Sequence, residues 1–173
     1  MNLNEALYNP YHMDAMAVYH FDRVNAMNVT GVWFMDGISS YGEQLKRGEG
    51  LTGTDFDPSL APHPKYLLLA NYQFNAYYGK ISVTKGTVVN LNLSGYAGLG
   101  TVGFDFGNKI ALDFGLGQDF FFTKNFGIRA DLRMYIYQGP NPTSITLRTG
   151  SAKPSASAFG NSTFYNTMLS VVG

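Results

Sequence analysis

Strict alternation of apolar and polar residues is the feature that most constrains this chain. Within residues 126–137, isoleucine, leucine and methionine occupy even positions, while arginine, aspartate and tyrosine occupy odd positions. Residues 87–97 repeat the pattern, with asparagine and serine on the polar side. A period of two places successive side chains on opposite faces of a β-strand. The pattern therefore predicts strands with one apolar and one polar face.

Seven segments carry this alternation. They cover residues 13–21, 25–35, part of 66–83, 87–97, 109–121, 126–137 and 163–173. The links after the first, third and fifth segments are hairpin-sized, about three residues long. The other links are 36–65, 98–108 and 138–162. Transmembrane barrels sort tight turns and long loops to opposite ends in this way, whereas soluble sandwiches have no reason to do so.

The composition fits such a barrel better than a soluble core. Charged residues make up 14% of the chain, against about 25% in an average soluble domain. Aromatic residues reach 15%, yet mean hydropathy is −0.08. A zero net charge gives no reason to expect nucleic-acid binding. There is no cysteine, and no apolar run approaches the roughly 20 residues of a membrane-spanning helix.

We expect the polar faces to point inward. Two neighbouring strands carry charged residues of both signs beside glycines, which suits a narrow, self-neutralising lumen. The predicted lumen salt-bridge network is Asp113, Asp119, Arg129, Asp131 and Arg133. The predicted lipid-facing residues are Val89, Leu91, Leu93, Ile110, Leu112, Phe114, Leu116, Ile128, Leu132, Met134 and Ile136.

An odd number of strands conflicts with the even counts of single-chain bacterial barrels. A further strand before Asn2 would give eight, and barrel chains commonly finish on an aromatic residue where this one has Gly173. No basic and apolar signal segment follows Met1. We therefore expect the sequence to be a mature form or internal piece, with 1–173 lacking the first strand and the extreme C-terminus, or with the gap closed by another segment.

Several segments resemble small outer-membrane β-barrel domains of deltaproteobacteria, similar in size to the OmpA and OmpX barrels. They are 6–12 (ALYNPYH), 71–83 (NYQFNAYYGKISV), 88–100 (VVNLNLSGYAGLG) and 122–133 (FTKNFGIRADLR). The resemblance spans most of the chain. It implies eight strands, a bacterial outer-membrane location, no known catalytic residues and a role within a larger envelope assembly.

Three patterns of possible chemistry are weaker. Gly98–Gly103 spells a dinucleotide fingerprint, but no helix follows to receive a pyrophosphate. The histidines, at positions 12, 20 and 63, show no metal or catalytic spacing. Asp55 and Asp57 lie in an oxygen-rich loop that lacks the EF-hand spacing. We expect no catalytic residue, no cofactor and no metal.

The sequence thus predicts an all-β, antiparallel, up-and-down transmembrane β-barrel of the eight-stranded type. Its expected role is structural, with partners in outer-membrane lipid and in other envelope proteins that contact loops 36–65 and 138–162. Two alternatives remain open at this point. One is a soluble lipocalin-like carrier of an apolar ligand, and the other is a small passive pore.

Overall fold

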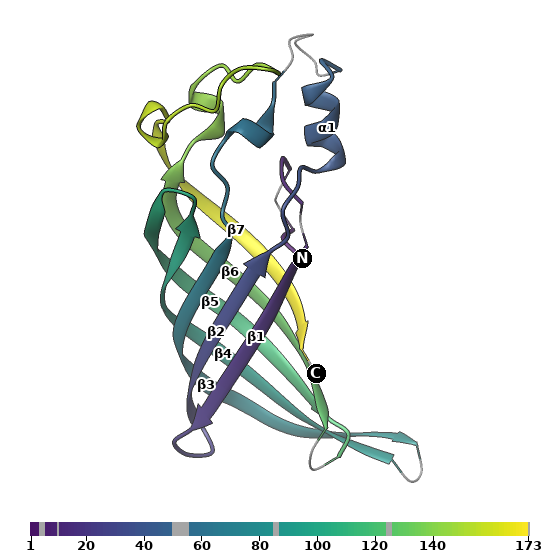
Figure 1. Ribbon diagram of the computed structural model, residues 1–173. Helices are drawn as coiled ribbons and strands as arrows, with labels where there is room; N and C mark the ends of the chain where they lie inside the picture. The colour runs from purple at the N-terminus through teal and green to yellow at the C-terminus, as the bar shows by residue number, and fades with distance from the viewer. Residues whose placement is uncertain (4–5, 10, 50–55, 85–86, 124–125, 173) are drawn as a thin grey trace.

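The computed structural model shows a single curled antiparallel sheet with a cap of loops at one end (Figure 1). It describes residues 1–173 except 4–5, 10, 50–55, 85–86, 124–125 and 173. The strands are β1 (His12–His20), β2 (Asn25–Phe34), β3 (Tyr66–Thr84), β4 (Thr87–Phe104), β5 (Gly107–Phe121), β6 (Gly127–Pro140) and β7 (Asn161–Val172). Short helices lie between strands: α1 (Ser40–Lys46), η1 (Pro58–Leu60), η2 (Pro142–Ser144) and η3 (Ala156–Ala158).

The order of the strands confirms the predicted all-β, up-and-down arrangement. The seven strands follow one another in the sheet as they do in the sequence, each antiparallel to its neighbour. Among the described residues no ladder joins β1 to β7, so the sheet is open along that line. No helix in the described part of the chain combines the length and hydrophobicity needed to span a bilayer.

The sheet curls far enough for distant strands to face one another. The Arg133 guanidinium on β6 donates a hydrogen bond to Thr30 Oγ1 on β2, at 3.4 Å. These two strands are separated by three others in the sheet order. Such a contact is possible only across the concave side, which we call the inner face. The opposite side is the outer face.

The predicted long link 98–108 is wrong. β4 continues through the glycine-rich segment to Phe104, and β5 begins at Gly107. Gly107 has a φ of +134°, a conformation that suits a tight hairpin. Gly98 and Gly100 belong to the ladder, and a Cβ at Gly100 would lie 2.0 Å from the Leu68 carbonyl oxygen. The glycines of this segment therefore mark places where two backbones come close together, and they do not mark a loop.

The inner face has two tiers. Next to the cap it is apolar and aromatic, with a core of Val32, Leu67, Leu69, Val102, Phe104, Ala111, Tyr135, Tyr137 and Met168. Further toward the β1–β2 and β5–β6 turns it is polar. The rings of Tyr137 and Phe164 stack with centroids 5.3 Å apart, and Tyr137 stacks on Tyr135 at 5.9 Å. Side chains therefore fill the inside of the curl near the cap.

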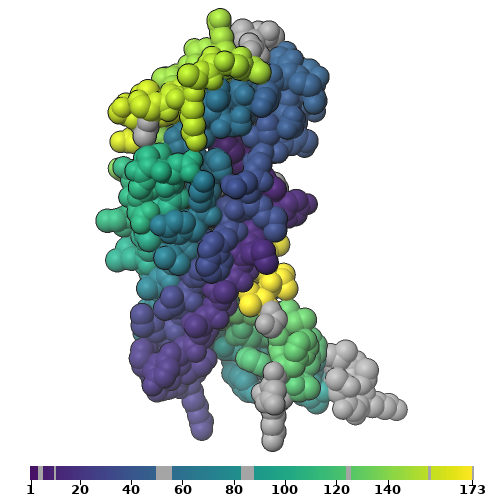
Figure 2. All heavy atoms as spheres, viewed as in Figure 1, coloured from purple at the N-terminus to yellow at the C-terminus, as the bar shows by residue number. Residues whose placement is uncertain are grey.

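The long loops after β2 and β6 fold against each other. A small apolar core of Ala61, Leu147 and Phe159 forms between them, with Phe56, Leu60 and Ile145 packed around it. The Asp57 amide donates to the Leu147 carbonyl at 2.9 Å. We call residues 36–65 and 138–162 together the cap. Figure 2 shows them as one continuous mass at the end opposite the β1–β2 turn.

Candidate functional site

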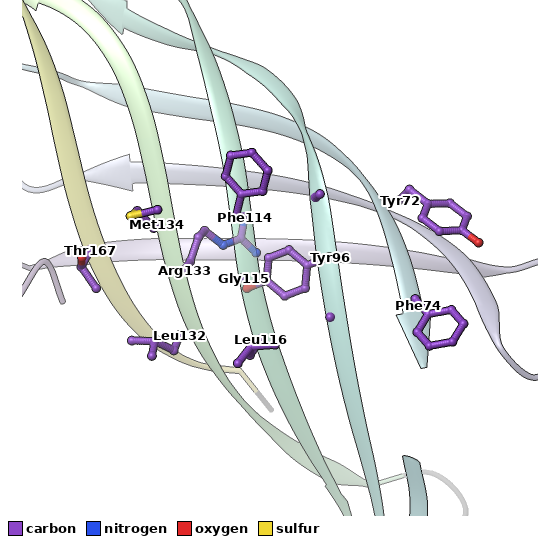
Figure 3. A pocket seen from close by; sticks show the side chains of 12 residues that line it. Tyr72, Phe74, Tyr96, Phe114, Gly115, Leu116, Leu132, Arg133, Met134 and Thr167 are labelled. Atoms are coloured by element: carbon purple, nitrogen blue, oxygen red, sulfur yellow. The ribbon is translucent and has the colours of Figure 1, made fainter. Parts of the chain in front are cut away.

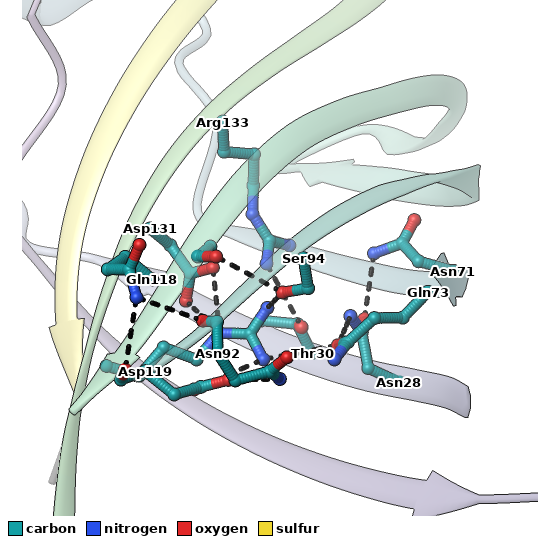
Figure 4. A network of polar contacts seen from close by, with 12 residues as sticks. Asn28, Thr30, Asn71, Gln73, Asn92, Ser94, Gln118, Asp119, Asp131 and Arg133 are labelled. Carbon is teal, nitrogen blue, oxygen red and sulfur yellow. Dashed lines mark hydrogen bonds and ion pairs between the residues drawn. The ribbon is translucent and has the colours of Figure 1, made fainter. Parts of the chain in front are cut away.

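The structure brings the five charged residues predicted for the lumen onto the inner face, in two groups of ion pairs. Figure 4 shows Asp119, Asp131 and Arg133 among the polar side chains around them. In the first, Arg129 Nε lies 2.9 Å from Asp131 Oδ1, and Arg129 Nη1 lies 3.7 Å from Asp119 Oδ1. In the second, Arg133 Nη1 lies 3.3 Å from Asp113 Oδ2. All five sit on β5 and β6, whose alternation turned them to the same side.

These charges are withdrawn from solvent. Asp113 is 0% exposed, Asp131 2%, Arg133 3% and Arg129 8%. Charges buried to this extent are costly unless they are paired and hydrogen-bonded. Arg129 meets that requirement, because it is both paired and hydrogen-bonded. Arg133 and Asp113 are paired, but both oxygens of the Asp113 carboxylate and Arg133 Nη1 lack a hydrogen bond.

Amide and hydroxyl groups from facing strands complete the network. The predicted salt-bridge network did not include them. Gln73 Oε1 on β3 accepts from Arg129 Nη1 at 3.2 Å, and Ser94 Oγ on β4 accepts from Arg129 Nη2 at 3.3 Å. Asn28 bridges onward, donating to Gln73 and accepting from Asn71. Their shared signal was present in the sequence, because each occupies a polar position of an alternating strand.

Glycines on β5 make room for the largest inner side chains. A Cβ at Gly115 would lie 2.4 Å from the Tyr96 ring, and one at Gly117 would lie 2.4 Å from Arg129 Nη2. The Arg133 guanidinium sits 4.9 Å from the centroid of the Tyr96 ring, in cation–π range. The middle of the inner face is therefore filled by side chains that extend over neighbouring glycines.

The outer face is apolar along its length. Ile110 is 78% exposed, Leu116 59% and Leu132 47%. The other predicted lipid-facing residues that lie exposed or half-buried are Leu91, Leu93, Leu112, Phe114, Ile128, Met134 and Ile136. Exposed aromatic and aliphatic side chains that the prediction omitted join them, including Tyr72, Phe74, Leu99, Leu169 and Val171.

Val89 is the exception, since it is only 5% exposed and does not belong to this apolar surface. It lies one residue beyond Asn90, where β5 stops pairing with β4. The β3–β4 hairpin continues past that point as two strands, below a register shift between Asn75 and Tyr77. Two-stranded ribbons twist more strongly than wider sheets, so the faces of the hairpin depart from those of the sheet.

A shallow apolar depression of about 670 Å³ marks the outer face (Figure 3). Tyr72 and Phe74 border it on one side, and Leu116, Leu132 and Met134 border it on the other. Gly95 lies low between them, with only Leu116 Cδ2 near the place of a Cβ, at 3.8 Å. Contiguous exposed apolar surface of this kind marks contact with an apolar partner or with a membrane.

Ion pairs tie the cap together and to the sheet. Lys46 Nζ lies 3.3 Å from Asp57 Oδ2, while Asp105 lies 2.6 Å from Lys65 and 3.2 Å from Lys153. The Lys65 hydrogen bond, with help from Lys153, holds the pKa of Asp105 below its ordinary value. Burial alone would raise the pKa of Asp57, but hydrogen bonds from Ser59 and Lys46 outweigh it and lower the pKa.

The histidines and the oxygen-rich loop of the sequence have structural contacts in the described residues. His63 stacks on Tyr8 at 5.1 Å between ring centroids, and His12 Nε2 lies 3.0 Å from Ser170 Oγ. Asp57 caps η1 by accepting from the Ser59 amide, while Asp55 lies outside the described residues. Within the described ranges, no three histidine, aspartate or glutamate side chains are grouped closely enough to hold a metal ion.

Comparisons of the chain with protein-family models, with curated proteins and with solved structures returned no match.

Proposed function

We propose that this chain is the β-barrel domain of a bacterial outer-membrane protein with a structural and interaction role. One observation carries the proposal: over the polar tier of the inner face, the polarity of the two faces is the reverse of that in a water-soluble sheet. Ile110, Leu116 and Leu132 stand outward, while Asp113 and Asp131 are shut inside. A soluble sheet buries its apolar face, whereas a lipid-embedded barrel exposes it to hydrocarbon.

The inner face argues against the two alternatives. A carrier of the lipocalin type needs an apolar cavity, and the middle of this inner face holds ion pairs and amides instead. A passive pore needs an open passage. Arg129, Arg133 and Tyr96 reach over glycines to fill the centre, and the aromatic tier fills the region next to the cap.

The cap is the part of the domain that we propose for contact with other envelope proteins. It combines a small core of its own with exposed polar groups from residues 36–65 and 138–162. Binding residues are often found on loops that a rigid scaffold holds in place. The resemblance to deltaproteobacterial barrels implies a role within a larger envelope assembly. In such an assembly, the cap would contact the other proteins.

The test is refolding of the urea-denatured chain in three conditions: buffer, detergent micelles and phospholipid vesicles. We expect a β-type circular dichroism spectrum with protease protection of the strands in micelles and vesicles, and aggregation in buffer alone. A folded, soluble monomer in buffer would contradict the proposal. Unchanged vesicle conductance in the folded state would separate a filled barrel from a pore.

A further inference from the structure

A pocket of about 210 Å³ lies where the sheet meets the cap, at the end that Figure 1 shows uppermost. Phe104 of β4, Tyr137 of β6 and Phe164 of β7 line it on the side of the sheet. The cap lines the other side, and residues 6–8 also border it. Among the described residues, no charged side chain belongs to this lining. The pocket is therefore distinct from the polar network of the inner face.

Aromatic rings form much of the wall of the pocket. The rings of Tyr137 and Phe164 are stacked with an interplanar angle of 20°, and the Phe104 ring lies 5.8 Å from that of Tyr137. Tyr8 adds a fourth ring. It is held in place because it stacks on His63 and donates a hydrogen bond to a backbone carbonyl of η1 at 3.3 Å. Aromatic rings attract other rings in offset-stacked or edge-to-face arrangements. This wall therefore suits a flat aromatic ligand.

Prolines supply the cap side of the pocket. There are four of them, two from each long loop: Pro62, Pro64, Pro140 and Pro142. Proline has no N–H group, so these residues present apolar rings and no backbone donor. Pro140 ends β6, and Pro142 begins η2, which Asn141 caps by accepting from the Thr143 amide at 2.9 Å. Walls that are already formed lose little freedom when a ligand binds.

One polar side chain reaches this apolar lining. Asn166 borders the pocket and is only 6% exposed. Its Nδ2 donates to the Tyr135 hydroxyl at 3.3 Å and to the Tyr137 hydroxyl at 3.4 Å. Its Oδ1 receives no hydrogen bond from the described residues. The amide oxygen is thus the acceptor that remains for a ligand, and a few placed polar groups of this kind give apolar pockets their specificity.

We propose that this pocket binds a small aromatic molecule that carries one hydrogen-bond donor, such as a phenol or an indole. The ring packs against the aromatic wall, and the N–H or O–H group donates to Asn166 Oδ1. An apolar cavity of about 150 Å³ is enough for benzene. A pocket of about 210 Å³ therefore admits one substituted ring or an indole, and it excludes drug-sized molecules.

A quaternary ammonium ion is the other ligand that aromatic walls commonly bind. A cage for such a cation has rings that surround it. Here Tyr137 and Phe164 are nearly parallel neighbours, and no carboxylate of the described residues lines the pocket. The geometry therefore favours the aromatic ligand. The inference depends on the pocket alone and is independent of the membrane location.

The test is a titration of the folded chain with 4-fluorophenol, followed by fluorine NMR of the probe. We expect saturable binding with a Kd of roughly 1 mM or tighter. Ala6→Trp should abolish saturation, because Ala6 is an exposed residue at the border of the pocket and the larger ring can occupy it. The matched control is Ala152→Trp, at an exposed position of the cap outside the lining, which should bind the probe as the unmodified chain does.

A second comparison tests the hydrogen bond. Asn166→Leu should weaken binding of 4-fluorophenol roughly three- to tenfold and leave binding of fluorobenzene, which has no donor, unchanged. Circular dichroism checks that this variant folds, and Ala6→Trp keeps the test valid if it does not. Uptake of the probe that is linear and identical in Ala6→Trp would overturn the proposal, since the probe would then only partition into detergent. Displacement of the probe by tetramethylammonium and not by phenol would overturn the class of ligand.

Discussion

Replacement of Arg129 by leucine tests whether the inner charges are a structural unit. Arg129 Nε donates to both oxygens of Asp131 at 2.9 and 3.0 Å, and its terminal nitrogens donate to Gln73 and Ser94. The change leaves Asp131, only 2% exposed, as a buried carboxylate without its cation. Removing one partner of a buried pair costs about 3–5 kcal/mol. That corresponds to roughly two to four orders of magnitude in the folding equilibrium.

Urea titration of the refolded chain in micelles measures this cost. The unfolding midpoint of Arg129→Leu should fall by about 1 M or more, given an ordinary dependence on urea. Arg148→Leu, on the exposed surface of the cap, should shift stability by no more than about 0.5 kcal/mol. The double change Arg129→Leu with Asp131→Leu should recover part of the loss, because no lone charge remains. A wild-type midpoint for Arg129→Leu would refute the reasoning.

Three further outcomes follow from the faces, the glycines and the cap. Leu132→Arg should destabilise vesicle-folded protein by about 2–4 kcal/mol if its exposed face lies in hydrocarbon, as measured by urea unfolding; no loss would contradict a lipid contact. A Cβ at Gly117 meets a guanidinium nitrogen at 2.4 Å, whereas one at Gly95 meets its nearest atom at 3.8 Å. Gly117→Ala should therefore cost about 1–3 kcal/mol and Gly95→Ala much less; equal thermal midpoints would argue against a filled interior. The pKa of Asp105 is lowered in the folded state, chiefly by the hydrogen bond from its nearer lysine. The ion pairs of Asp105 therefore stabilise the folded state fully at pH values above the pKa of an unfolded aspartate, about 3.9. This stabilisation is lost as the pH falls through the lower pKa of the folded state. Proteolysis of the cap by an acid-active protease should accelerate over that range, and a profile unchanged by Asp105→Asn would contradict the assignment.

The alternation of β5 and β6 was sufficient to predict which residues share a face. In residues 128–136 every second side chain is apolar, so one register decision assigns the whole strand. The inward position of Arg129 and Asp131 could be predicted from that register alone. The hydrogen bonds that Arg129 donates to Gln73 and Ser94 could not be predicted in this way, because those residues lie on strands that only the curl of the sheet brings close to β6.

Features that depend on contacts distant in sequence could not be predicted. Leu147 and Phe159 lie in segments without periodicity, so nothing local indicates that they pack with Ala61. The helix α1 begins after Ser39, whose side chain accepts from the Gly42 amide. That capping signal was readable in the sequence, but a seven-residue helix gives little apolar pattern to support it.

The glycines of β5 have a consequence for how the diameter of the curl is determined. Gly115 and Gly117 offer no volume, and the ring of Tyr96 and the guanidinium of Arg129 occupy the space that they leave. Inside the curl, each of these long side chains therefore packs against the backbone of a glycine. Shortening Tyr96 or Arg129 would leave a local void, while the other long side chain and the aromatic tier next to the cap would still fill the inside of the curl.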